Sequence, residues 1–327
     1  MQSFINISVI VPFFNARQFI GRCADSLMRQ SLKSGIEFIF VDDCSTDGGR
    51  QVLEETIASF PERNGQVRIL TNTANMGSAF SREAGQNAAR GEYLIHCDAD
   101  DWVEPQIYES MLLHAEKTSA DIVCTPFVEE MPDGKSRVVR FKSTTFPSIN
   151  QTPLNTLHFS LCNKIIRRQI ISGNDLHFFS GVDCWEDMGL VFRALIFSRI
   201  TVILDIPYYH YVRNQGESLT SKSGKILADH LVFVEKMNEW FATQPQELSA
   251  TYAPFIRNVK FTAKIKMLRG EHRDIERWKA TFPETNTKIM QYRIIPLHYR
   301  ILFYLANTLP LPLVKAAINL FRSMAGK

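Results

Sequence analysis

Short apolar runs alternate with amphipathic stretches over the first hundred residues, and this alternation constrains the fold more than any other feature of the 327-residue chain. The apolar runs lie at 7–12, 37–41, 67–70 and 93–96, and the amphipathic stretches between them at 16–30, 49–59 and 78–89. Strands and helices that alternate in this way predict βαβ units around a parallel sheet.

The pattern changes further along the chain. A helix over 108–119 and a strand over 122–127 are expected, followed by a hairpin in which the turn at 132–134 leads into 137–141. Residues beyond about 220 show mainly helical periodicity. The sequence therefore predicts an α/β domain over 1–220, with a Rossmann-like, mostly parallel central sheet flanked by helices, and a helical C-terminal region over 221–327.

Composition excludes some functions and favours a compartment. The formal net charge is +3 and no Lys/Arg run could follow a phosphate backbone, so nucleic acid is not an expected partner. The six cysteines contain no CxxC pair, which favours reduced thiols in a cytoplasmic protein. The N-terminus lacks a signal-peptide pattern, and the most apolar window, 301–320, is interrupted by Asn, Lys and two Pro residues. We expect no spanning helix.

Three carboxylates within four positions, Asp98, Asp100 and Asp101, directly follow the apolar run 93–96. Crowded carboxylates raise one another's pKa, and a divalent cation is the natural way to hold them ionised. Oxygen ligands favour Mg²⁺ or Mn²⁺. The alternative interpretation is a solvated acidic cap of the next helix.

A second acidic strand end, Asp42 and Asp43, repeats this pattern earlier in the chain. Thr46 or Asp47 is a candidate cap for the helix that follows. A carboxylate at a strand end can instead accept hydrogen bonds from a nucleotide base or a ribose hydroxyl.

Taken together, these segments resemble the family 2 glycosyltransferases of the GT-A fold. The resemblance rests on residues 9–15 (VIVPFFN), 41–48 (VDDCSTDG) and 98–101 (DADD), in that order. It continues through residues 75–77, 163–168, 185–187 and 209–213, and it covers roughly residues 4–220.

The resemblance implies roles for individual residues. The donor nucleotide-sugar is expected at Pro12, Phe14, Asn15, Asp42, Asp43, Arg82, Asp98 and Ala99. Phe14 replaces a frequent Tyr, which keeps a stacking face but loses a hydroxyl. Asp98 and Asp100 match the DxD pair that faces the ribose and the metal, and Asp101 is expected to support them. His210 is a candidate third metal ligand or diphosphate contact, with a satisfied strand histidine as the alternative.

The resemblance places the chemistry later in the chain. Asp187 matches the base that takes the proton from the acceptor hydroxyl, with Glu186 beside it; the alternative for Glu186 is an ordinary helix-start acid. Trp185, Lys164 and Arg213 are candidate acceptor contacts, although Lys164 could equally be a packed stem. Arg213 begins a stretch through Ser218 that is expected to close over the donor.

The implied activity is inverting, single-sugar transfer, dependent on Mn²⁺ or Mg²⁺, from a UDP-sugar to an acceptor hydroxyl. Expected acceptors are bacterial surface glycans, namely lipopolysaccharide, O-antigen, capsule or exopolysaccharide intermediates, free or lipid-linked. Two rival interpretations are a sugar-nucleotide nucleotidyltransferase and an inactive membrane-associated scaffold. The tail after about residue 290 is aromatic and carries only basic charge. It either lies on the cytoplasmic face of the inner membrane or packs on the protein or a second copy.

Overall fold

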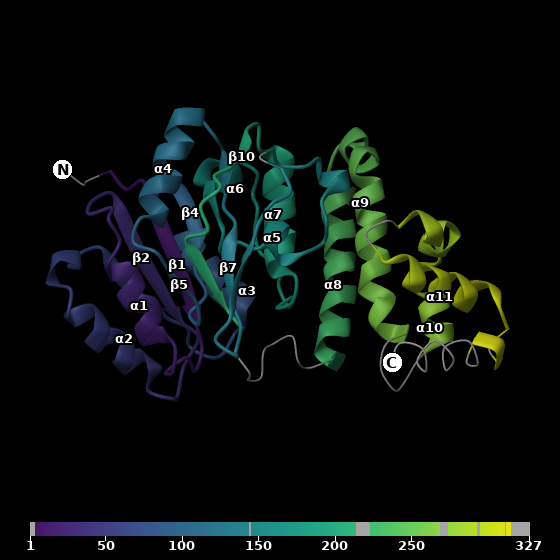
Figure 1. Ribbon diagram of the computed structural model, residues 1–327, viewed down its shortest axis with the longest axis horizontal. Coiled ribbons are helices and arrows are strands. Elements are labelled where there is room, and N and C mark those ends of the chain that lie inside the picture. Colours follow the sequence, from purple (N-terminus) through teal and green to yellow (C-terminus); the bar gives the residue numbers. More distant parts are fainter. Residues whose placement is uncertain are drawn as a thin grey trace. The chain divides into compact units, whose positions relative to one another are not determined.

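The computed structural model describes residues 4–143, 145–213, 223–268, 274–292, 295–310 and 312–314. It divides into two compact units (Figure 1). The first comprises Met1–Ile149 and Asn155–Ser221, and the second comprises Asn150–Leu154 and Lys222–Lys327. The short segment Asn150–Leu154 thus belongs to the second unit although it lies far from it in the sequence.

The first unit is built on a seven-stranded sheet of order β10-β6-β9-β4-β1-β2-β3. Its strands are β1 Ile7–Phe13, β2 Ile36–Asp42, β3 Val67–Thr71, β4 Tyr93–His96, β6 Ile122–Cys124, β9 Lys164–Arg167 and β10 Thr201–Ile203. β9 runs antiparallel to β4 and β6, whereas the other neighbouring strands pair in parallel. The predicted α/β fold with a mostly parallel central sheet is confirmed.

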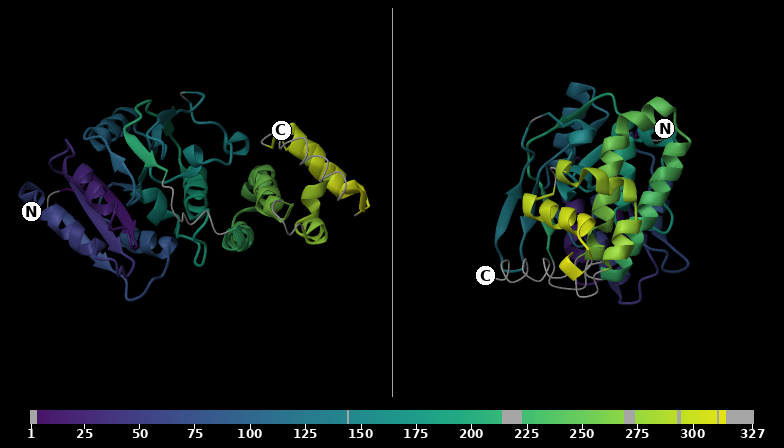
Figure 2. Two further views of the ribbon diagram at one scale, coloured as in Figure 1. Left: turned by 60° about the horizontal axis from the view of Figure 1, so that its bottom comes forward. Right: turned by 90° about the vertical axis from the view of Figure 1, so that its right-hand side faces the viewer.

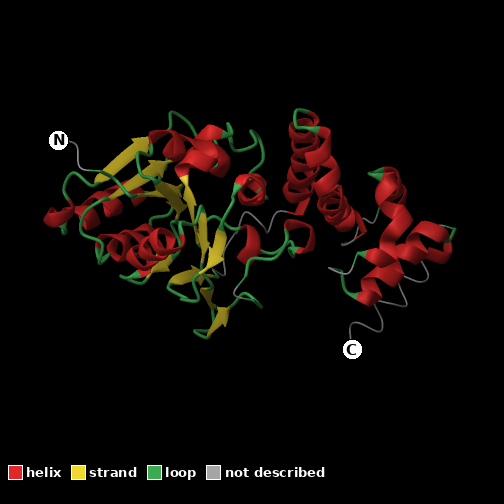
Figure 3. Cartoon of the chain, turned by 90° about the horizontal axis from the view of Figure 1, so that it is seen from above, coloured by secondary structure: helices red, strands yellow, loops and turns green. Residues whose placement is uncertain are grey.

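Helices surround these strands (Figure 3). They are α1 Ile20–Met28, α2 Gly49–Ala58, α3 Ser78–Ala88, α4 Ile107–Thr118, α5 Thr156–Phe159, α6 Arg168–Gly173 and α7 Glu186–Phe197. Helix α3 lies directly against β1, since a Cβ added at Gly85 would come within 2.4 Å of Ile10 Cγ2. This close approach brings the start of α3 to the carboxyl ends of the strands, where open α/β sheets place their sites.

A small second sheet completes the first unit. Its order is β5-β11-β7-β8, with β5 Trp102–Val103, β7 Phe127–Glu130, β8 Ser136–Val139 and β11 Tyr209–Val212. The single strand expected over 122–127 was wrong, because the chain leaves the large sheet after Cys124 and enters the small one at Phe127. Pro126 lacks an N–H for a continuous ladder. The expected hairpin is present as β7 and β8.

The described elements of the second unit are helical (Figure 2). They are α8 Ser223–Ala242, α9 Gln246–Lys264, α10 Ile275–Ala280 and α11 Leu297–Thr308, with 3-10 turns at Ile265–Leu268 and Pro283–Gln291. Phe261, Trp278, Tyr292 and Phe303 share its core, and the rings of Phe261 and Tyr292 stack with centroids 4.4 Å apart. The aromatic start of the predicted tail is therefore packed; residues 315–327 lie outside the described chain.

Candidate active site

The ends of β1 and β2 are tied together by Asn15, whose backbone is left-handed with φ 48°. Its Oδ1 accepts a hydrogen bond from Thr46 N at 2.8 Å, and its own N–H donates to Ser45 Oγ at 3.0 Å. Asp42 Oδ1 in turn accepts from Ser45 N at 2.9 Å. Phe14 follows the strand and is 45% exposed, whereas Asp42 is buried. The predicted base-binding residues thus lie on two adjoining strand ends.

Asp43 has a role that the sequence did not predict. Its Oδ1 accepts from Asn72 Nδ2 at 2.7 Å and from Met76 N at 2.9 Å, and its Oδ2 accepts from Gly77 N at 2.8 Å. The carboxylate is buried and fixes the loop that leads into α3. Both oxygens are engaged, so Asp43 holds the site together while Asp42 remains the better candidate for the nucleotide.

The three acids at the end of β4 also differ in their roles. Asp101 is buried, with Oδ2 accepting from the Tyr209 hydroxyl at 2.5 Å and Oδ1 from Val212 N at 2.8 Å. Burial, and then the neighbouring charges of Asp98 and Asp100, raise the pKa of Asp101 well above its ordinary value. Asp101 therefore anchors β11 to this strand end, in the supporting role expected of it.

Asp98 faces Arg82 across the site. Its Oδ1 accepts from Arg82 Nη2 at 2.7 Å, and its side chain is 28% exposed. Ala99 beside it is 9% exposed, and the main-chain oxygen of Asp100 accepts from Arg22 Nη2 at 2.6 Å. The donor and metal candidates at this strand end thus lie partly open at the surface of the first unit.

Arg82 joins this strand end to the candidate base. The guanidinium is 6% exposed, and its Nε lies 3.6 Å from Glu186 Oε1 and 3.5 Å from Asp187 Oδ1. The resemblance implied a nucleotide contact for Arg82, but the structure places it among carboxylates. It brings Asp98, Glu186 and Asp187 together although almost ninety residues separate the first from the others.

Glu186 and Asp187 begin helix α7. Burial and the adjacent Asp187 raise the pKa of Glu186 to about 8, although Arg82 opposes the shift. Burial also raises the pKa of Asp187, while Arg82 and a hydrogen bond from Leu161 N at 3.1 Å act against it. Burial thus makes Glu186 the more easily protonated of the two, whereas Arg82 and Leu161 N favour the ionised form of Asp187, the candidate proton acceptor.

The start of α7 is also tied to the start of α3. Ser78 Oγ donates to Asp183 Oδ1 at 3.5 Å and to Glu186 Oε1 at 3.4 Å. Asp183 lies so close to Gly77, which has φ 91°, that an added Cβ would come within 2.4 Å of its Oδ1. Trp185 is the N-cap residue of α7, with a left-handed backbone of φ 74°, and it directly precedes Glu186 in the chain.

Two predicted contacts lie elsewhere. His210 has Nε2 3.3 Å from Glu104 and Nδ1 3.0 Å from Glu130, and its ring stacks on Trp102, so its nitrogens face these acids instead of the β4 carboxylates. Lys164 is fully buried.

The three protons of Lys164 are taken by Leu157 O, Ser160 O and Asn163 Oδ1 at 2.7–3.0 Å. The alternative for Lys164 was a packed stem with a solvated head, but the ammonium is buried as well as the stem. All three of its protons are engaged within the protein, so none is left for an acceptor sugar. Arg213 donates to buried Glu129, and the lid expected from residue 214 onward lies outside the described residues.

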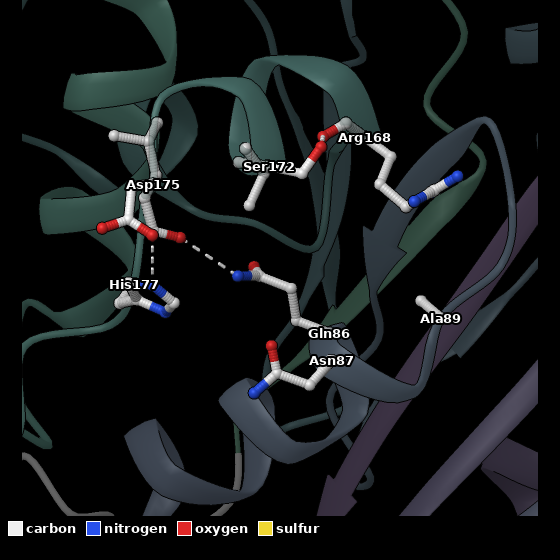
Figure 4. Close-up of a pocket in the computed structure, with 9 residues that line it drawn as sticks. Gln86, Asn87, Ala89, Arg168, Ser172, Asp175 and His177 are labelled. Atoms are coloured by element: carbon white, nitrogen blue, oxygen red, sulfur yellow. Dashed lines mark hydrogen bonds and ion pairs between the residues drawn. The ribbon is translucent and has the colours of Figure 1, made fainter.

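A cavity of about 270 Å³ lies at the far end of α3 from this cluster (Figure 4). Its lining includes Gln86, Asn87, Arg168, Asp175 and His177, and none of the predicted donor or acceptor residues. Searched over the described residues, the chain has no group of three or more His, Cys, Asp or Glu side chains placed to hold a metal ion. No described helix combines the length and apolar character needed to cross a membrane.

A mostly parallel sheet with acidic residues at its strand ends is typical of the GT-A fold. The sequence model of the family described as "Glycosyl transferase family 2" matches residues 8–173, and the chain belongs to this family.

Among curated relatives, glycosyltransferase GlyG of Streptococcus pneumoniae is 31% identical over 66% of this chain and 73% of its own. Poly(ribitol-phosphate) β-N-acetylglucosaminyltransferase TarS of Staphylococcus aureus is 26% identical over 66% of this chain. The match spans only 37% of the length of TarS.

Solved structures show the same fold. The S. aureus TarS 1–349 complex with UDP-GlcNAc superposes with a TM-score of 0.59 at 18% identity, over 92% of this chain and 87% of that one. Mannosyltransferase PcManGT of Pyrobaculum calidifontis, in complex with GDP-Man and Mn²⁺, superposes with a TM-score of 0.56 at 12% identity. That match covers 100% of this chain and 82% of the other.

Proposed function

We propose that this chain is an inverting glycosyltransferase that moves a sugar from a UDP-sugar to a hydroxyl of a bacterial surface glycan. Family membership supports sugar transfer, and the UDP-GlcNAc held by TarS supports the choice of donor. One observation of this structure carries the proposal, namely that Arg82 holds the donor-side carboxylate Asp98 and the candidate base Asp187 in one cluster. A nucleotidyltransferase would have no need of a base there.

The proposed division of labour follows from the contacts. The nucleotide base lies against the exposed ring of Phe14, beside Pro12, Asn15 and Asp42, and the sugar diphosphate extends toward Asp98. Asp187 takes the proton from the acceptor hydroxyl as the hydroxyl attacks the anomeric carbon from the side opposite the departing nucleoside diphosphate.

A divalent cation fits Asp98 and Asp100. Mg²⁺ is commonly held by one or two carboxylates together with substrate phosphates, so no third protein ligand is required. Around Asp98, the positive charge of Arg82 faces the carboxylates of both Asp98 and Asp187, and this excess of negative charge favours a cation. Mn²⁺ or Mg²⁺, when bound, would offset the charge that develops on the departing diphosphate.

Acceptor binding is proposed at the start of α7. Trp185 precedes Glu186 and Asp187 directly, and an indole face suits the C–H surface of a sugar ring. The names of TarS and of a poly(ribitol-phosphate) β-glucosyltransferase of Bacillus spizizenii support a surface polymer or its precursor as acceptor. Lipopolysaccharide, O-antigen, capsule and exopolysaccharide intermediates all present such hydroxyls.

Helix α11 supports peripheral contact with the cytoplasmic face of the inner membrane. Leu297, Ile301 and Tyr304 recur at positions i, i+4 and i+7 and are 45–53% exposed, while Phe303 and Ala306 are buried. An apolar stripe on a helix in a region with only basic charge fits an anionic bilayer surface. Replacing these three residues by Ser should abolish sedimentation with anionic liposomes, and unchanged sedimentation would contradict the contact.

A donor panel tests the enzymatic proposal. Release of nucleoside diphosphate from UDP-, GDP- and TDP-sugars is measured with and without Mn²⁺, for wild type, Asp187→Asn and Asp100→Asn. We expect a loss of about 10³-fold in kcat for Asp187→Asn and a weaker donor affinity for Asp100→Asn. Asp25→Asn, which removes an exposed carboxylate paired with Arg29 on α1, is the matched control. Full activity in both site variants would overturn the assigned roles.

A further inference from the structure

We propose that Arg82 is a positioning residue that couples the donor-side carboxylate Asp98 to the base Asp187. The inference rests on the function proposed above and gives Arg82 a task other than holding the nucleotide. Its guanidinium contacts acids from the end of β4 and the start of α7, while its own backbone belongs to α3. Three elements of the first unit therefore meet at one buried cation.

The contacts of Arg82 are unequal. Nη2 donates to Asp98 Oδ1 at 2.7 Å, a full charge-assisted hydrogen bond, whereas Nε lies 3.5 Å from Asp187 Oδ1, beyond good hydrogen-bond length. Within the described part of the chain, Arg82 Nε, Arg82 Nη1 and Asp187 Oδ1 are buried atoms without a hydrogen-bond partner. Leaving such groups unpaired is costly, so a small movement that closes the gap between Nε and Oδ1 is favourable.

Asp98 and Asp187 compete for the positive charge of Arg82. Whatever draws Asp98 away from the guanidinium releases Arg82 toward Asp187. A donor that engages Asp98 therefore tightens the hold of Arg82 on the base, which orients the Asp187 carboxylate and keeps it ionised. Such coupling would assemble the base when the donor is in place, and leave it loosely held when the donor is absent.

Several contacts hold helix α3, which carries Arg82, in place beside the acids. Gly85 lets α3 pack closely against Ile10 of β1. Asp43 fixes the loop in front of the helix, and Ser78 adds a second tie to Glu186. The backbone of Arg82 therefore belongs to a helix that is held at several points, and its long side chain is the part that can change conformation.

The test compares Arg82→Met, Arg82→Lys and Asp187→Asn, singly and with each Arg82 variant combined with Asp187→Asn. We expect Arg82→Met to lower kcat for nucleoside diphosphate release about 10²-fold, Arg82→Lys to recover part of this loss, and Arg82→Met to have little further effect in the Asp187→Asn background. Equal losses in both backgrounds would overturn the proposal.

Calorimetric titration with UDP gives a readout that does not depend on turnover. If Arg82 links the two acids, Asp187→Asn should change the Kd for UDP about fivefold when Arg82 is present and leave it nearly unchanged in Arg82→Met. Additive changes in Kd would also overturn the coupling.

A buried arginine outside the cluster provides the matched control. Arg63 is 1% exposed and donates to the carbonyl oxygens of Met28, Gln30 and Leu32. Arg63→Met should lower the melting temperature without the non-additive pattern, and the same pattern in that variant would reduce the Arg82 effect to general destabilisation.

Failure of the proposed function is distinguishable from failure of the coupling. A wild type that releases no nucleoside diphosphate but shows the non-additive Kd values contradicts the function alone, whereas an active wild type with additive values contradicts only the coupling.

Discussion

Two acidic strand ends of the first unit look alike in sequence and differ in structure. At the end of β2, Asp43 uses both oxygens to hold the loop before α3, and Asp42 is 3% exposed with a backbone N–H as its partner. At the end of β4, Asp101 uses both oxygens to anchor β11, whereas Asp98 is 28% exposed and faces a guanidinium.

The comparison separates scaffold from site within each run of acids. A carboxylate whose two oxygens both accept from buried donors stabilises the fold and is closed to a ligand. A carboxylate whose partner is a shared cation can exchange that partner for a substrate group. By this criterion the β4 end should govern turnover, and the β2 end should govern stability and nucleotide affinity.

The largest expected effect is on turnover at the β4 end. Asp98→Asn should lower kcat/KM for nucleoside diphosphate release by about 10²–10³-fold, because it removes the charge that faces both Arg82 and the donor. Asp42→Asn should lower kcat/KM by about tenfold, mainly through KM. Steady-state kinetics with a saturating acceptor measures both. Equal losses in the two variants would erase the distinction between the strand ends.

A smaller effect is expected on stability at the β2 end. Asp43→Ala should lower the free energy of unfolding by about 3 kcal/mol, since it leaves the N–H groups of Met76 and Gly77 and the amide of Asn72 without their acceptor. Urea unfolding monitored by circular dichroism measures the change. Asp42 accepts from a single backbone N–H, so Asp42→Asn should lower the free energy of unfolding by less than about 1 kcal/mol. A larger loss of stability in Asp42→Asn than in Asp43→Ala would contradict the structural role assigned to Asp43.

Sequence reasoning predicted the sheet and its acidic ends because both depend on local patterns. The runs around β1, β2 and β4 each carry enough apolar residues to specify a buried strand, and the acidic motifs directly follow two of these runs. The supporting role of Asp101 was implied by the resemblance. Which of Asp42 and Asp43 is closed to ligands could not be predicted, because the partners of Asp43 lie about thirty residues further along the chain.

The position of Arg82 was missed for a related reason. From the sequence alone, an arginine on a helix is expected to be exposed or to bind a ligand. Only the fold shows that Arg82 of α3 lies close to Asp187 of α7. The same limit applies to Lys164, because two of its three acceptors are main-chain oxygens that no side-chain pattern reveals.

The smallest effect on stability is expected at the opposite end of β2, where Glu37 is a buried carboxylate held by hydrogen bonds. Glu37 is 1% exposed and accepts from Ser8 Oγ at 2.6 Å and Arg90 N at 2.7 Å. Burial alone would raise the pKa of Glu37, but the hydrogen bonds from Ser8 and Arg90 outweigh it and lower the pKa below the ordinary value.

Because the folded-state pKa of Glu37 is the lower one, its stabilising contribution is complete above the unfolded-state pKa and is lost as pH falls through the folded-state pKa. Glu37→Gln should therefore cost about 1 kcal/mol near pH 7 and progressively less as the pH is lowered below about 4. Urea unfolding of both proteins across this range measures the difference. A gap between wild type and variant that stays constant with pH would mean that Glu37 acts through packing alone. Turnover near pH 7 should stay within about twofold of wild type, since Glu37 lies at the end of β2 away from the acids that face the donor.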